Sequence, residues 1–166
     1  MSRFITLQFC SFDSFWGKAI PWFTQGDVGH VDAVLPDGSL LGAQHEAGLG
    51  GPDVPAGVQI RPANYGDTSG MTGRIRVPLP ATDGQADTFW SFLQAQIGKP
   101  YDVTAIEAFI AGRNWHDPDA WFCSELIAAA LEHAGVFPYP LSSPANRVTP
   151  ASLLLVCSAL AETVPA

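Results

Sequence analysis

Two segments far apart in the chain carry the residue types of a reactive thiol. The segment Trp121-Phe122-Cys123-Ser124-Glu125-Leu126 opens an alanine-rich stretch, which places Cys123 on the first turn of an expected helix. Helix-end N–H groups and the helix dipole favour a thiolate at such a position. Upstream, Gly29-His30-Val31 begins a predicted strand. A cysteine at a helix start and a histidine base together predict nucleophilic thiol chemistry.

The other two cysteines, Cys10 and Cys157, lie within apolar runs. Free cysteine is often buried, so we interpret both as small core residues. Three cysteines without metal-ligand spacing predict neither a disulfide framework nor a zinc site. We therefore expect no metal and no cofactor. The alternative is a metal site on one of two clusters that lack a known ligand spacing, namely His30, Asp32, His45 and Glu46, or His116, Asp117 and Asp119.

A hairpin after His30 supplies the candidates for a third site residue. Residues 30–35 and 39–45 flank a Pro-Asp-Gly segment, and Asp-Gly between apolar runs is typical of a tight turn. A two-residue turn places His45 opposite His30, with Cβ atoms about 5 Å apart on one face of the sheet. His45 would then hold the His30 ring in its working tautomer. A three-residue loop would place Gln44 there instead; the two-residue turn is preferred because it is the commoner type.

Hydrophobic periodicity predicts strands in the first half of the chain and helices mainly in the second. The predicted strands cover residues 3–10, 30–35, 39–45, 58–61 and 74–79. The predicted helices cover residues 13–23, 83–97, 103–110, 120–134 and about 150–160. This segregation predicts a single α+β domain over residues 1–166.

Composition disfavours several classes of protein. The net charge is −8 and the eight basic residues are scattered, so nucleic-acid binding is not expected. A hydrophobic content of 47% is inconsistent with global disorder. Neither a membrane span nor a secretory signal is evident. We therefore expect the protein to be cytoplasmic at synthesis, with release by lysis or another export route left open.

The ordered motifs resemble a known group of enzymes. Gly98-Lys99-Pro100-Tyr101, followed after a gap by Phe122-Cys123-Ser124-Glu125-Leu126, resembles the nucleophile region of NlpC-type cell-wall peptidases, which have a papain-like fold. In most of that family the histidine follows the cysteine, whereas here only His133 does, on the same helix. The order of histidine strand first and cysteine helix last is similar to the circularly permuted branch, the YiiX-like proteins and the lecithin–retinol acyltransferase group.

This resemblance implies a small antiparallel sheet or barrel packed against the cysteine helix. It implies Cys123 as nucleophile, His30 as base and a polar third residue on the next strand. Tyr101 would lie beside the thiol and help bind an oxyanion. Asp32 shares the face of His30, either as a second polar group in the cleft or as a solvated carboxylate.

The activity implied by the resemblance is hydrolysis of an amide bond, for example in cell-wall peptides, through a thioester. Two alternatives stay open. One is a lipid or other acyl hydrolase or acyltransferase on the same fold, and the other is a non-catalytic binding module that retains the fold. The expected partner is thus an amide- or acyl-containing substrate, peptide or lipid, and the oligomeric state is not predicted.

Overall fold

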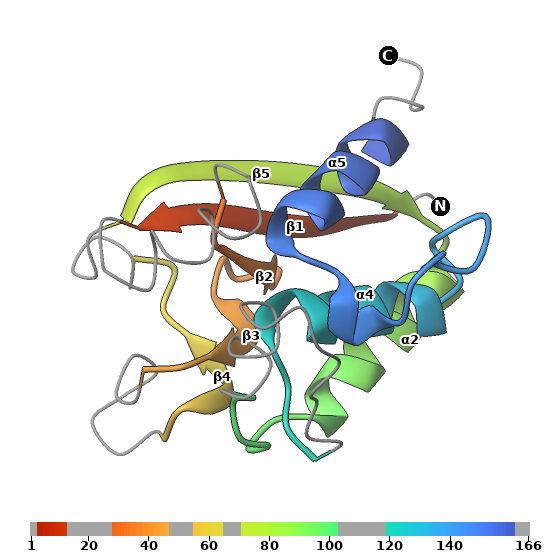
Figure 1. The fold of residues 1–166 in the computed structure, drawn as a ribbon. Coiled ribbons are helices and arrows are strands. Elements are labelled where there is room, and N and C mark those ends of the chain that lie inside the picture. The colour runs from red at the N-terminus through yellow and green to blue at the C-terminus, as the bar shows by residue number, and fades with distance from the viewer. Residues whose placement is uncertain (1–2, 13–27, 47–54, 65–70, 103–118, 162–166) are drawn as a thin grey trace.

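The computed structural model describes residues 3–12, 28–46, 55–64, 71–102 and 119–161 (Figure 1). These residues form nine elements in chain order: β1 (Arg3–Phe12), β2 (His30–Val34), β3 (Leu40–Gln44), β4 (Gly57–Arg61), β5 (Met71–Ala81), α2 (Asp83–Ala95), α4 (Cys123–His133), the 3₁₀ helix η2 (Ala145–Arg147) and α5 (Pro150–Ala161). The predicted α+β class is confirmed. The helices predicted over 13–23 and 103–110 lie outside the described residues.

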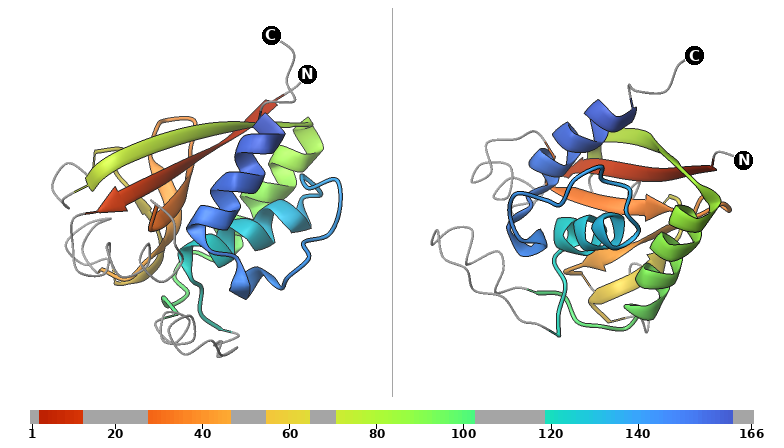
Figure 2. Two further views of the ribbon diagram at one scale, coloured as in Figure 1. Left: turned by 45° about the horizontal axis from the view of Figure 1, so that its top comes forward. Right: turned by 90° about the vertical axis from the view of Figure 1, so that its right-hand side faces the viewer.

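The five strands make one antiparallel sheet in the order β4-β3-β2-β1-β5. Strand β2, which begins at His30, therefore lies between β1 and β3. Helix α4 contacts β2 and β3, α2 contacts β1, and α5 contacts β5. Figures 1 and 2 show these three helices gathered to one side of the sheet.

Alternation along β2 separates an apolar face from a polar one. Val31 and Ala33 belong to the hydrophobic core, together with Leu126 and Ile127 of α4. Successive side chains of a strand point to opposite faces, so the polar residues of β2 lie on the other face. They are nevertheless buried, so this face of the sheet is not simply solvated.

The register of the β2–β3 hairpin decides which residue lies opposite His30. Ala33 pairs with Leu41, and continuing this antiparallel register places Gln44 opposite His30. The preferred prediction, with His45 at that position, is therefore wrong by one residue. The alternative with Gln44 is the register that the structure adopts.

The turn itself explains the shift in register. The Leu35 N–H donates to the Ser39 carbonyl (2.8 Å), so three residues form the loop between them. Gly38 closes this loop with φ of +87°, in the left-handed region that favours glycine. Asp37 Oδ1 accepts a hydrogen bond from the Ser39 N–H (2.9 Å). Pro-Asp-Gly here forms a three-residue connection and not the two-residue turn.

Helices α2 and α5 begin at threonine side-chain caps. Thr82 Oγ1 accepts from the Gln85 N–H (3.2 Å) at the start of α2. Thr149 Oγ1 accepts from the Ser152 N–H (3.1 Å) at the start of α5, where Pro150 is the first helical residue. Within the described ranges, no helix is long and apolar enough to cross a membrane.

Candidate functional site

Cys123 is the first residue of α4, as its sequence context predicts. The preceding residue, Phe122, is extended (φ −85°, ψ 154°), and its carbonyl accepts the first helical hydrogen bond from Leu126 (3.0 Å). The Cys123 N–H is thus among the leading amides of the helix, which have no intrahelical acceptor. Its side chain has no exposed surface. The thiol therefore lies in the interior, at the positive end of a helix dipole.

Several contacts fix the start of α4. Glu125 Oε2 accepts from the Phe122 N–H (3.2 Å), so this buried carboxylate caps the helix. Ser124 Oγ donates to the Val148 carbonyl (2.5 Å). Just before the helix, Trp121 pairs with Tyr101 in an isolated parallel bridge. Contacts of the residues just before and just after Cys123 therefore fix its position.

His30, at the first position of β2, contacts both the Asp32 carboxylate and the Cys123 thiol. Its Nε2 atom is 3.0 Å from Asp32 Oδ1, and its ring also forms a hydrogen bond with Cys123. Burial alone would lower the pKa of His30, but the charge of Asp32 and the hydrogen bonds to Asp32 and Cys123 raise that pKa to about 9. The geometry thus favours an imidazolium at neutral pH. The prediction that His30 and Cys123 come together is confirmed.

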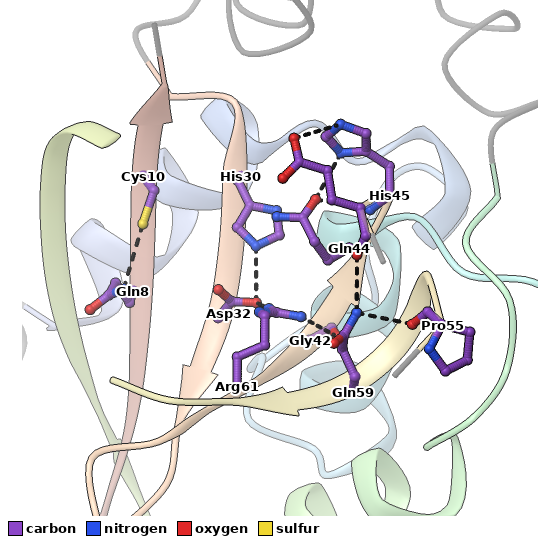
Figure 3. A network of polar contacts seen from close by, with 11 residues as sticks. Gln8, Cys10, His30, Asp32, Gly42, Gln44, His45, Pro55, Gln59 and Arg61 are labelled. Carbon is purple, nitrogen blue, oxygen red and sulfur yellow. Dashed lines mark hydrogen bonds and ion pairs between the residues drawn. The ribbon is translucent and has the colours of Figure 1, made fainter. Parts of the chain in front are cut away.

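Behind His30 lies a buried ion pair between Asp32 and Arg61, both of which have no exposed surface. Arg61 Nη2 contacts Asp32 Oδ1, and its Nη1 donates to the Gly42 carbonyl (3.2 Å). Figure 3 shows His30, Asp32, Arg61 and Gly42 as a continuous chain of contacts across β2, β3 and β4. Asp32 is therefore a member of the site and not a solvated carboxylate.

Sequence reasoning missed Arg61 altogether. A signal was present, because Arg61 ends a short predicted strand in which a charge is unexpected. Its partner, however, lies on a strand that is not adjacent to it in the sheet. Only the three-dimensional arrangement shows which carboxylate neutralises this arginine.

Gln44 and His45 interact with each other at the end of β3. Gln44 Oε1 accepts from the His45 N–H (2.9 Å) and lies 2.8 Å from His45 Nδ1. In Figure 3 the Gln44 amide lies between the rings of His30 and His45. The contact with the His30 ring predicted for His45 is made instead by Asp32, whose Oδ1 lies 3.0 Å from Nε2.

His45 still lies near the site. Its ring is 6.0 Å from the Tyr101 ring, and its Nε2 is 3.6 Å from Glu46 Oε1. The pKa of His45 is lowered overall. Burial and the charge of His30 lower it, and the Glu46 carboxylate only partly offsets them. His45 therefore favours the neutral form beside a protonated His30.

Tyr101 lies beside the thiol, as the resemblance implies. Its ring is 5.8 Å from that of Phe122, and its hydroxyl forms a hydrogen bond with Cys123. Burial raises the pKa of the Tyr101 phenol, and the nearby Cys123 and Asp102 raise it further. The hydroxyl is thus kept protonated and available as a donor.

The remaining cysteines are both buried, which confirms their interpretation as core residues. Burial, with a contribution from the charge of Asp32, raises the pKa of Cys10 to about 12. Burial raises the pKa of Cys157 to about 12 as well. Neither thiol is set up to ionise near neutral pH.

Within the described part of the chain, no group of three or more His, Cys, Asp or Glu side chains could hold a metal ion. His116 and Asp117 of the second alternative cluster lie outside the described residues. In comparisons with known proteins, neither a family model nor a curated protein sequence matches the chain. What the protein does is therefore inferred from the geometry of the site.

Proposed function

We propose that this protein is a cysteine hydrolase that cleaves an amide bond, built on a papain-like fold of the circularly permuted NlpC type. One observation carries the proposal: the His30 ring lies between the Cys123 thiol, at a helix start, and the Asp32 carboxylate. A nucleophile, a base and a group that orients the base are the three parts of a thiol triad. The antiparallel sheet in contact with the cysteine helix is compatible with such a fold.

The two nitrogens of His30 have separate tasks in this proposal. Nε2 is the atom closest to Asp32, which leaves Nδ1 to take the proton of the Cys123 thiol. Asp32 stabilises the resulting imidazolium, and the first amides of α4 stabilise the thiolate. In this proposal the imidazolium of His30 and the thiolate of Cys123 are stabilised by groups of the protein itself.

The reaction then follows in two balanced stages. The Cys123 sulfur attacks the carbonyl carbon, a C–S bond forms, and the tetrahedral oxyanion is met by the Cys123 N–H and the Tyr101 hydroxyl. Imidazolium His30 gives its proton to the leaving nitrogen as the C–N bond breaks. Water, with His30 as base, next hydrolyses the thioester, which releases the acid and restores the thiol.

A protonated His30 is compatible with an amide as the substrate. An amine is a poor leaving group and departs only when it is protonated, so amide cleavage requires a general acid beside the leaving nitrogen. The pKa of His30, raised to about 9, meets this requirement. An ester needs this acid less, and a lipid acyl substrate is therefore the second candidate.

The test is the pH dependence of iodoacetamide alkylation at each cysteine, read by mass spectrometry on the native protein. Cys10, Cys123 and Cys157 all have no exposed surface, so a difference in their rates reports thiolate formation and local opening. We expect Cys123 alone to react rapidly at pH 6–7, and to slow in His30→Ala. Equal, slow rates at all three thiols would contradict the proposal and favour a non-catalytic binding module.

A reactive Cys123 then permits a direct comparison of substrates. Matched amide and ester compounds with one acyl group are offered to the protein, and the acyl-enzyme is sought as a thioester adduct by intact mass. We expect the amide to be turned over. Turnover of the ester alone would replace the amide proposal with an acyl hydrolase.

A further inference from the structure

We infer that Arg61 is a positioning residue of this site, which holds the Asp32 carboxylate against His30 through a space that Gly42 leaves open. The inference rests on the proposed function, since it concerns the group that orients the catalytic base. It assigns a role to the strand β4, on which Arg61 lies.

The first support is the placement of the charges. Arg61 and Asp32 have no exposed surface, and removing two charges from water costs several kcal/mol for each ion. Well-packed apolar residues often replace a buried ion pair without loss of stability. The pair is therefore poorly explained as a stabilising device. Its position directly behind His30 indicates a role in the site.

The second support is that one oxygen serves both neighbours. Asp32 Oδ1 contacts Arg61 Nη2 and also lies 3.0 Å from His30 Nε2. The guanidinium is in turn tied to the backbone of β3, where its Nη1 donates to the Gly42 carbonyl (3.2 Å). A planar guanidinium held at two points restricts rotation of the carboxylate. Arg61 thus orients Asp32, and Asp32 orients His30.

The third support is the absence of a side chain at Gly42. A Cβ atom built on this residue would overlap the Asp32 carboxylate and closely approach the Arg61 guanidinium. A side chain at this position would therefore displace the Asp32 carboxylate from its buried pair with Arg61. The backbone at Gly42 is not in the left-handed region, so its conformation does not require glycine. The space occupied by the Asp32–Arg61 pair does.

The test reads the His30 imidazole directly by ¹H–¹⁵N NMR, which reports both its tautomer and its titration. The titratable groups around His30 are Asp32 on its own strand and Cys123 on α4, which contact its ring, His45 after β3, and Cys10, its cross-strand partner on β1. Arg61→Lys and Gly42→Ala retain all of them and retain a positive charge on β4. A change in the titration therefore reports the position of Asp32.

In Arg61→Lys and Gly42→Ala, we expect the His30 pKa to fall from about 9 toward its ordinary value of 6.5. We also expect Cys123 alkylation at pH 7 to slow by about tenfold, the factor that corresponds to one pKa unit. The matched control is Arg76→Lys on β5, an exposed arginine whose Nε donates to Gln8 (3.0 Å). It makes the same chemical change without touching Asp32 and should leave both measurements unchanged.

If Arg61→Lys fails to fold, Gly42→Ala alone carries the test, because a Cβ at this position displaces the Asp32 carboxylate while both charges of the pair are retained. Its His30 pKa should fall in the same way. An unchanged His30 tautomer and titration in the folded variants would overturn the positioning role. An unreactive Cys123 in the unaltered protein would instead overturn the proposed function, so the two failures are distinguishable.

Discussion

Cys10 on β1 and Cys123 at the start of α4 are two buried thiols beside the same histidine. Cys10 is paired with His30 across the sheet, and Cys123 forms a hydrogen bond with its ring. Neither has any exposed surface. The two buried sulfurs therefore differ in their side-chain contacts and in the backbone around them.

The surroundings of the two sulfurs differ in backbone structure and in hydrogen-bond partners. Cys10 lies within a strand, where the Gly29 N–H donates to its carbonyl (3.0 Å) and Gln8 Nε2 donates to its sulfur (3.6 Å). Burial and the charge of Asp32 raise the pKa of the Cys10 thiol to about 12. Cys123 instead has the leading amides of a helix around it. The two thiols thus differ in setting: the Cys10 sulfur lies on a strand, whereas Cys123 lies at a helix N-terminus in contact with His30 and Tyr101.

Removing each sulfur in turn tests which of the two cysteines is needed for turnover, and this should give the largest effect. Cys123→Ala should reduce turnover of an amide substrate by at least about a thousandfold, because the covalent route is lost. Cys10→Ala is the matched control and should retain turnover per folded molecule. Rates are measured at equal concentrations of folded protein, judged by circular dichroism. Loss of turnover in Cys10→Ala alone would show that the wrong thiol has been assigned.

The histidine shared by the two thiols gives the next largest effect. His30→Ala should slow alkylation of Cys123 at pH 7 by about a hundredfold, the usual contribution of a general base. Cys10 should remain as unreactive as before, because its ionisation is opposed by burial. The measurement is peptide-resolved mass spectrometry after timed alkylation. A similar fall at both cysteines would indicate a general change in opening of the protein.

His30 should also make stability depend on pH. Its pKa is raised from 6.5 to about 9 in the folded protein, so the folded state holds the proton more tightly than the unfolded chain. This contribution is complete below pH 6.5 and is lost as pH rises to 9, with a decrease of up to about 3 kcal/mol in the free energy of unfolding. Denaturant titrations across this range measure it.

The control for that prediction is His30→Gln, which should flatten the curve between pH 6.5 and 9. The raised pKa values of Cys10 and Cys157 affect stability at higher pH, where the unfolded thiols ionise first. A slope that survives in His30→Gln would assign the pH dependence to another group.

The smallest effect concerns the two residues at the end of β3. Gln44 lies opposite His30 in the observed register, whereas His45 contacts Tyr101 and Glu46. We therefore expect Gln44→Ala to reduce Cys123 alkylation severalfold, because the Gln44 amide lies between the His30 and His45 rings and bonds His45. His45→Ala should have a smaller effect. The opposite order, measured under the same conditions, would mean that His45 orients the site after all.

Much of the fold was predictable because periodicity is a local property. Alternation located β1, the Asp-Gly turn between two apolar runs located β2 and β3, and apolar spacing located α2 within two residues at each end. The position of Cys123 on the first turn of α4 followed from the same kind of pattern. The hairpin register was not predictable with the same certainty, because Pro-Asp-Gly closes either a two-residue or a three-residue loop.

The amino-acid sequence by itself thus determined the parts: an alternating sheet, an alanine-rich helix that begins at Cys123, and a strand that begins at His30. These depend on contacts between residues close in the chain, whose spacing is visible in the sequence. Only the tertiary structure decided the partners. The Asp32 carboxylate lies beside His30 and Arg61 because β2, β3 and β4 are neighbours in one sheet. The turn at Gly38 sets the β2–β3 register, and the β3–β4 pairing places Arg61 opposite Leu40.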